Sequence, residues 1–182
     1  NPFGGGGTPT SVITMSTSTG KVGFVLGNSS TFGDYLFICD GIDGWYIDSA
    51  GAVTHVVDPD FPTPHIPTPI FLDGYIWVAK GSDIYSCDLD TPSSWNASNF
   101  VSAESFPDAI VALARQNNQI VAFGSSSTEF FYDAANSSGS PFNRNEAALI
   151  QIGCASKDTI CQTEKYCAFL GQSKSGGYGY WI

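Results

Sequence analysis

Histidine is the side chain that most often moves protons near neutral pH, and this chain has 2 of them, His55 and His65. His55 falls at the end of an expected strand, and His65 lies in a proline-rich stretch. Neither follows a Gly-x-Ser-x-Gly turn or another recognisable nucleophile. The sequence therefore offers no arrangement of nucleophile and base of the kind that covalent catalysis requires.

Carboxylates are the second kind of residue that could do chemistry. Glu104 and Asp108 are near neighbours in sequence, and two carboxylates at a defined separation are what glycoside hydrolysis needs. A further acidic group consists of Asp43, Asp48, Asp58 and Asp60. Loop carboxylates more often cap turns by hydrogen bonds to the backbone, and none of these has the ligand spacing of a calcium loop. We predict turn capping, no catalytic, cofactor-binding or metal residues, no cofactor and no enzymatic activity.

The cysteines do not suggest a metal site or a disulfide framework. Five are present, at Cys39, Cys87, Cys154, Cys161 and Cys167. Their number is odd, their spacing matches no zinc motif, and Cys39, Cys87 and Cys167 lie in strand-like runs. We expect buried structural thiols and synthesis in a reducing compartment.

Composition and charge exclude several function classes. The chain has 182 residues, of which 42% are hydrophobic, enough for one domain with a hydrophobic core. Asp and Glu number 17 against 7 Lys and Arg, so the formal net charge is −10. An acidic chain repels phosphate backbones, and we expect DNA to pass nearby without specific binding. The sequence has no apolar run of about 18 residues, so nothing in it predicts insertion into a membrane.

The two ends of the sequence suggest a longer parent. The chain begins with Asn1-Pro-Phe-Gly and ends with Tyr180-Trp-Ile182. The first residues show neither an initiator methionine nor the basic and apolar regions of a signal peptide. We expect this sequence to be a piece of a larger polypeptide.

A repeated strand pattern positions all of these residues. Short apolar runs separated by Gly, Asn, Asp and Ser are typical of an all-β protein, and Ile110 to Arg115 could be a short helix or a strand. Each repeat has a buried strand and then an aromatic strand. The pairs are 34–41 with 45–48, 74–81 with 84–88, 119–124 with 129–133, and 165–171 with 178–182.

The repeat period favours one architecture. The first three units end on Asp48, Asp88 and Asp133, at intervals of about 40 to 45 residues, which is typical of β-propeller blades with four strands each. We predict a β-propeller, with a sandwich of meanders as the competing fold. Residues 1–32 are expected to form a Gly-rich segment and a first strand pair, Ser11–Ser18 with Lys21–Leu26. Blades are expected at about 33–68, 69–108, 109–151 and 152–182, the last one incomplete.

The stretch Asp58 to Ile70 contains five prolines, which exclude helix and central strand. It is either a stiff linker between blades or a protruding segment on which a partner docks. Four tryptophans leave a further alternative open, since exposed tryptophan binds sugars whereas buried tryptophan packs between blades. They are Trp45, Trp77, Trp95 and Trp181.

Three motifs in a fixed order carry a resemblance to a known family. They are Ala103-Glu-Ser-Phe-Pro-Asp-Ala-Ile110, Phe123-Gly-Ser-Ser-Ser-Thr-Glu-Phe-Phe131 and Gly153-Cys154. Together with flanking pieces from about residue 34 to residue 182, this series resembles the podophage packaged-DNA stabilisation proteins, also described as tail accessory, hub or nozzle proteins. Pro107 and Gly124 match family positions and are expected to form turns.

The resemblance implies a structural protein of the virion tail, made in the host cytoplasm. Its propeller domain would form a homo-hexameric ring below the portal adaptor, extend the DNA channel, help to retain the packaged genome and anchor tail fibre or tail-tip proteins. Two alternatives come from the residues alone. One is a carbohydrate-binding propeller that recognises host glycans, and the other is a propeller hydrolase, for which no catalytic set is visible.

Overall fold

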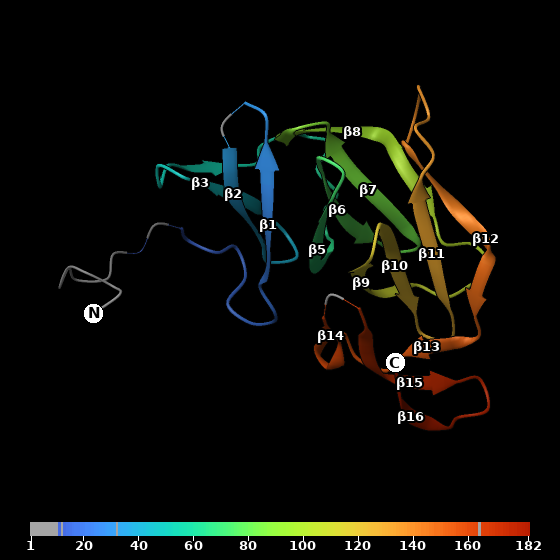
Figure 1. The fold of residues 1–182 in the computed structure, drawn as a ribbon. Helices are drawn as coiled ribbons and strands as arrows, with labels where there is room; N and C mark the ends of the chain where they lie inside the picture. Colours follow the sequence, from blue (N-terminus) through green and yellow to red (C-terminus); the bar gives the residue numbers. More distant parts are fainter. Residues whose placement is uncertain (1–10, 12, 32, 164) are drawn as a thin grey trace.

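The computed structural model describes residues 11, 13–31, 33–163 and 165–182. Within these residues the regular structure consists of β-strands and one short 3-10 helix, η1 (Lys157–Thr159). The strands form four antiparallel sheets of four strands, which follow one another along the chain and are arranged in an arc (Figure 1). This is the predicted all-β architecture of successive propeller blades.

The first three sheets are simple meanders in which each strand pairs with the next. Sheet 1 contains β1 (Gly23–Ser29), β2 (Gly33–Cys39), β3 (Gly44–Asp48) and β4 (Val53–His55). Sheet 2 contains β5 (Ile66–Leu72), β6 (Tyr75–Lys80), β7 (Asp83–Asp88) and β8 (Thr91–Ser102). Sheet 3 contains β9 (Ile110–Gln116), β10 (Gln119–Gly124), β11 (Thr128–Asp133) and β12 (Phe142–Ile150).

Sheet 4 is built differently, around a single long strand. It contains β13 (Ile152–Cys154), β14 (Cys161–Gln162), β15 (Cys167–Ser173) and β16 (Tyr178–Trp181). All three other strands pair with β15, and η1 lies between β13 and β14. Short strands around one long strand make this sheet the least regular of the four.

Alternation along the strands explains why the sheets stack face to face. Successive side chains of a strand point to opposite faces, so a strand buried on both sides is apolar at every position. In β6, Trp77 packs in a cluster with sheet 3, whereas Ile76 and Val78 pack in a cluster with sheet 1. In β10, Ile120 faces sheet 2 and Val121 faces sheet 4. Sheets 2 and 3 are therefore buried on both faces.

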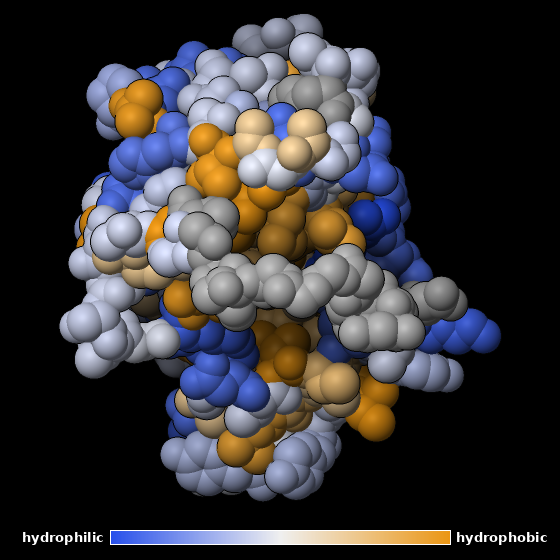
Figure 2. Space-filling model, turned by 90° about the vertical axis from the view of Figure 1, so that its left-hand side faces the viewer, coloured by the Kyte–Doolittle hydropathy of each residue, from blue (hydrophilic) through white to orange (hydrophobic). Residues whose placement is uncertain are grey.

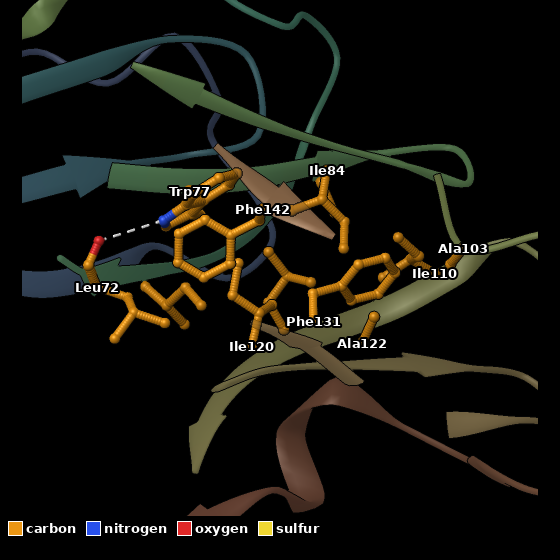
Figure 3. Close-up of a cluster of buried hydrophobic side chains, with 12 residues drawn as sticks. Leu72, Trp77, Ile84, Ala103, Ile110, Ile120, Ala122, Phe131 and Phe142 are labelled. Carbon is orange, nitrogen blue, oxygen red and sulfur yellow. Dashed lines mark hydrogen bonds between the residues drawn. The ribbon is translucent and has the colours of Figure 1, made fainter. Parts of the chain in front are cut away.

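The largest cluster lies between sheets 2 and 3. Trp77 is fully buried, its ring meets that of Phe142 edge-on with 4.5 Å between centroids, and its Nε1 donates to the Leu72 carbonyl at 3.4 Å (Figure 3). Phe131 and Ile120 fill the remaining space from sheet 3. Contacts of this kind between consecutive sheets are what hold the arc together, since one four-stranded sheet cannot bury both of its faces alone.

The sheets at the two ends of the arc keep apolar surface exposed. On the outer face of sheet 1, Phe24 and Leu26 of β1 are 59% and 73% exposed. Apolar side chains gather in the middle of this side of the molecule (Figure 2). In sheet 4, Tyr178 and Tyr180 of β16 are also exposed. Each end sheet thus presents a face of the type that the inner sheets bury against a neighbour.

Most predicted strands are confirmed, and the N-terminal hairpin is wrong. Ile110 to Arg115 is a strand, within β9. The described residues of Ser11–Ser18 form no strand. The strand expected at Lys21–Leu26 begins instead at Gly23 and pairs along its whole length with β2. The boundary expected between residues 32 and 33 therefore falls inside sheet 1, where β1 pairs with β2 and packs the partly buried Val25 against the cluster between sheets 1 and 2.

The proline-rich stretch is a connection between sheets 1 and 2, and its far end enters a strand. Pro67 and Pro69 lie in β5, where the pairing register with β6 shifts between Ile66 and Ile70. β5 is an edge strand of its sheet, a position that tolerates proline. Phe61 and His65 are buried, so this stretch packs against the sheets and does not protrude as a docking arm.

Candidate functional site

The two histidines are separated by environment and are not part of a catalytic set. His55 is exposed, with Nε2 3.3 Å from an Asp43 carboxylate oxygen. His65 is buried, and both of its ring nitrogens bond to backbone atoms of Pro62 and Gly41. Neither histidine has a serine, threonine or cysteine hydrogen-bonded to its ring among the described residues. The arrangement provides no general base for a nucleophile.

Of the acidic group predicted to cap turns, Asp48 and Asp58 do so, whereas Asp43 pairs with His55. Asp48 accepts from the amides of Ala50 and Ala52, both at 2.9 Å. Asp58 accepts from the Asp60 amide at 2.9 Å and, through its other oxygen, from the Trp95 amide at 3.1 Å. The second bond joins the connection after sheet 1 to the outer strand of sheet 2. These carboxylates fasten loops to strands.

Glu104 and Asp108 do not form an acid–base pair. Glu104 is exposed and lacks a hydrogen-bond partner among the described residues. Asp108 is turned toward the β10–β11 turn, where it accepts from the Ser126 amide at 2.7 Å and from the Ser127 hydroxyl at 3.1 Å. A cavity of about 430 Å³ lies beside this loop and is lined by both carboxylates, Ser82 and Phe106 among others. No base is paired with Ser82 there.

Asp108 belongs to a junction at which the three sequence motifs meet. The loop 103–109 connects sheet 2 to sheet 3, and Gly124 begins the turn that follows β10. A Cβ on Gly124 would lie 2.4 Å from the Asp108 carboxylate, so only glycine lets the carboxylate reach the turn. This explains why the sequence has Gly at position 124 directly before three serines.

Glu129 makes the second link between the first two motifs. Its side chain is almost fully buried, and it accepts from the Ser105 amide at 3.1 Å and the Ser105 hydroxyl at 2.9 Å. Arg144 of β12 lies 3.5 Å away and also pairs with the exposed Glu146. A buried carboxylate is tolerated only when it is hydrogen-bonded and paired, and here both conditions are met.

The third motif closes the junction from sheet 4. A Cβ on Gly153 would lie 2.1 Å from the backbone carbon of Ser125 and 2.2 Å from the Ser126 nitrogen, so the two backbones are in direct contact. Thr128 Oγ1 donates to the Ile152 carbonyl at 2.7 Å. Gln172 Nε2 donates to the Ser125 carbonyl at 3.1 Å. Sheet 4 is thereby fixed to the β10–β11 turn.

We call this set the motif junction. It consists of Ser105, Asp108, Gly124, Ser125, Ser126, Ser127, Glu129 and Gly153. The junction joins the sheet 2 to sheet 3 connection, the central hairpin of sheet 3 and the start of sheet 4. The sequence gives the order of the motifs but not their meeting, although Gly124 followed by three serines is a signal of a tight turn and of close backbone approach. Its hydrogen bonds and backbone contacts hold these three parts of the protein together.

Asp108 and Glu104 allow a matched test of this role. Asp108→Asn removes the charge and one of the two acceptor oxygens on which Ser126 and Ser127 depend. We expect it to lower the free energy of unfolding by about 1–3 kcal/mol, the range for hydrogen bonds to charged groups. Glu104→Gln, in the same loop but exposed, should stay within about 0.5 kcal/mol of the wild type. Urea unfolding followed by circular dichroism measures both, and equal effects of the two variants would contradict the assignment.

The cysteines, the remaining groups that could do chemistry, are mostly buried in the core. Cys39, Cys87, Cys154 and Cys167 are buried free thiols, and Cys161 is exposed. Burial raises the pKa of Cys87 to about 12 and that of Cys167 to about 11, which keeps both as unreactive thiols at neutral pH. Among the described residues there is no group of three or more His, Cys, Asp and Glu that could hold a metal ion. The same part of the chain contains no helix with the length and apolar character needed to cross a membrane.

Three of the four tryptophans are unavailable to a sugar. Trp45, Trp77 and Trp95 are 6%, 0% and 4% exposed, whereas Trp181 in β16 is 43% exposed. Trp95 packs edge-on against Phe61 with 5.0 Å between ring centroids, at the contact of sheets 1 and 2. Trp77 and Trp95 therefore serve as inter-sheet packing, and Trp45 stacks on His55 within sheet 1.

Comparisons with known proteins agree with this picture. Curated proteins gave no match to the chain. A family model described as Phage_stabilise, bacteriophage P22 Gp10, beta-propeller, matches residues 8–182. That match spans all four sheets and includes the whole motif junction. The chain therefore belongs to the phage family of packaged-DNA stabilisation proteins represented by P22 Gp10, and it has the β-propeller fold of that family.

Proposed function

We propose that this protein is a subunit of the hub or nozzle ring in the tail of a short-tailed phage. The ring extends the DNA channel, holds the packaged genome in place and carries tail fibre or tail-tip proteins. Its partners are further copies of the same protein, six in a ring, and the portal adaptor above them. The observation that carries the proposal is membership of a family of phage structural proteins that stabilise packaged DNA.

The way in which the sheets are fastened supports a structural role. A subunit that confines pressurised DNA must resist shear between its sheets, and the motif junction links three consecutive parts of the arc by backbone contact and by buried hydrogen bonds. Glu129 and Ser105 are bonded through both an amide and a hydroxyl, and Gly153 touches the backbone of Ser125. Such paired links oppose sliding because each requires one fixed register.

The distribution of charge supports passage of DNA without adhesion. Because neighbouring strands are antiparallel, alternate turns lie at the same edge of the arc. Six aspartates lie in or beside these turns: Asp34, Asp48, Asp73, Asp88, Asp90 and Asp133. The turns are tied together across sheets, since Ser30 Oγ donates to Asp90 and Asn118 Nδ2 donates to Asp73. We call this side the aspartate edge.

The aspartates act together on their surroundings. The pKa of Tyr75 is raised, first by burial and then by the charges of Asp133, Asp88 and Asp90. Two basic residues lie beside the β9–β10 turn: Arg115 donates to the Asn117 carbonyl, and the Lys165 carbonyl accepts from Gln116. An edge with this excess of negative charge repels the phosphate backbone of double-stranded DNA. If it faces the channel, the genome can move past it quickly.

The assembly state tests the ring. Light scattering would give the mass of the purified protein alone and after mixing with a purified portal–adaptor assembly. We expect a mass of six copies, formed at least in the presence of the adaptor. An unrelated acidic protein of similar size, mixed with the same adaptor, is the control for non-specific association. A monomer that ignores the adaptor at every concentration would contradict the ring.

A further inference from the structure

His65 is a buried histidine that joins the proline-rich connection to the β2–β3 turn of sheet 1 through both of its ring nitrogens. It lies within the proline-rich stretch and against the β2–β3 turn. Its Nδ1 lies 2.9 Å from the Pro62 carbonyl oxygen, and its Nε2 lies 3.3 Å from the Gly41 amide nitrogen. The His65 amide also donates to the Gly41 carbonyl at 2.8 Å. His65 and Gly41 are thus bonded in both directions.

These partners determine which nitrogen carries the proton. A carbonyl oxygen can only accept, so the hydrogen must be on Nδ1. A backbone amide can only donate, so Nε2 must be bare and must accept from Gly41. The neutral ring satisfies both bonds, and the imidazolium satisfies only one, since protonated Nε2 would point a second hydrogen at the Gly41 amide. Buried polar groups that lose their partner are costly.

The charged groups around the ring do not offer an alternative partner. Asp40 and Asp43, both in the β2–β3 turn, are the acidic residues that act on His65. Asp40 is already occupied, since one oxygen accepts from the amides of Ile42 and Asp43 and the other from those of Ser16 and Thr17. Burial therefore outweighs these charges and lowers the pKa of His65.

The aromatic neighbours connect the ring to sheet 2. Phe61 meets His65 edge-on with 5.0 Å between centroids, and Phe61 also meets Trp95 of β8 edge-on. His65 thus lies between the β2–β3 turn of sheet 1 and the outer strand of sheet 2. A change in its hydrogen bonding acts on the contact between these two sheets.

We propose that His65 is an acid-sensitive fastener between sheets 1 and 2. Protonation of Nε2 breaks the bond from the Gly41 amide, and the β2–β3 turn then separates from the proline-rich connection. The same turn holds Ser16 and Thr17 through Asp40, so the residues that precede β1 loosen with it. Acid would open this end of the arc, while the motif junction at the other end contains no histidine.

The direction of the pH dependence follows from proton binding. Below about pH 6.5 the unfolded chain binds a proton at this histidine more readily than the native state does. Stability therefore falls as the pH falls through this range, and the unfolding equilibrium constant rises by up to tenfold per pH unit, about 1.4 kcal/mol. The loss is absent above pH 7.

Two histidine variants isolate this contribution. His65→Gln keeps a side-chain oxygen for the Gly41 amide but cannot be protonated, and His55→Gln removes the exposed histidine as a control. Urea unfolding from pH 7.5 to 5.5 should show a shallower slope for His65→Gln than for the wild type, by up to one proton per molecule. His55→Gln should lose stability with falling pH as steeply as the wild type does. Equal slopes in wild type and His65→Gln would overturn the proposal.

Spectroscopy of the wild type tests the proposal even if His65→Gln does not fold. Nitrogen-15 NMR should show the proton of His65 on Nδ1 at pH 7. Acid should lower the protection of the Gly41 amide against hydrogen exchange, relative to the intrinsic exchange rate at each pH, more than that of Gly153. A proton on Nε2 at pH 7 would contradict the proposed hydrogen bonding. Titration of His65 in the folded protein without any change at the Gly41 amide would likewise overturn the proposal.

Discussion

Gly153→Ala is expected to lower the free energy of unfolding by about 3 kcal/mol or more, because a methyl group at this position has no space. The added Cβ would lie 2.1–2.4 Å from the backbone of Ser125 and Ser126. Backbone atoms cannot rotate away as a flexible side chain can, so sheet 4 must move off the β10–β11 turn. The Thr128 to Ile152 bond would be lost with it. Urea unfolding followed by far-ultraviolet circular dichroism measures the loss.

Gly179→Ala is the control for this change in the same sheet. Its Cβ would meet only Trp181 Nε1, at an ordinary contact distance of 3.5 Å. The variant should be within about 0.5 kcal/mol of the wild type. If Gly153→Ala proved as stable as Gly179→Ala, the direct contact between sheet 4 and the motif junction would be wrong. Insoluble Gly153→Ala beside soluble Gly179→Ala would agree with it.

Trp77→Ala is expected to cost about 3–5 kcal/mol, the range for removing a large aromatic side chain from a core. Trp77 is fully buried between sheets 2 and 3, and its loss leaves a cavity beside Phe142 and removes the Nε1 bond to the Leu72 carbonyl. The unfolding transition should be followed by circular dichroism, since the variant also loses a fluorophore. The midpoint in urea should fall with an unchanged slope.

Trp181→Ala controls for the loss of a tryptophan as such. Trp181 is 43% exposed in β16, so its removal should cost about 1 kcal/mol or less. Comparable losses in the two variants would contradict face-to-face packing of sheets 2 and 3 around Trp77.

The sequence predicts the strands of this protein well because their apolar pattern is local. A run such as Tyr75–Lys80, apolar at nearly every position between two turns, is a strand buried on both faces. The pairing of strands is harder to predict. Thr19-Gly20 suggests a turn between two N-terminal strands, yet β1 pairs with β2 at seven positions and partly buries Val25 there. Long-range pairing outweighs a local turn signal.

The proline-rich connection shows a second limit of local rules. Proline excludes a central strand, but Pro67 and Pro69 lie in β5 because an edge strand with an irregular register leaves their missing amides without consequence. Sequence alone does not reveal which strands lie at an edge. It also does not show that His65, in the same connection, turns inward to Gly41.

The motif junction could be predicted only in part. The sequence gives its residue types and their order, and glycine followed by serines is a sign of a tight turn at Gly124. The contact of Ser105 with Glu129 joins a loop to a strand position 24 residues away, and that of Gly153 with Ser125 joins two sheets. Such contacts depend on how sheets stack, which no pattern within a single strand specifies.

Genome retention tests the central claim most directly. Phage particles assembled without this protein would be compared with complete particles for the amount of packaged DNA that survives nuclease treatment. We expect the deficient particles to fill and then lose their DNA, and purified protein added before the treatment to restore retention. Deficient particles that keep their genome as fully as complete ones would contradict a role in stabilising packaged DNA.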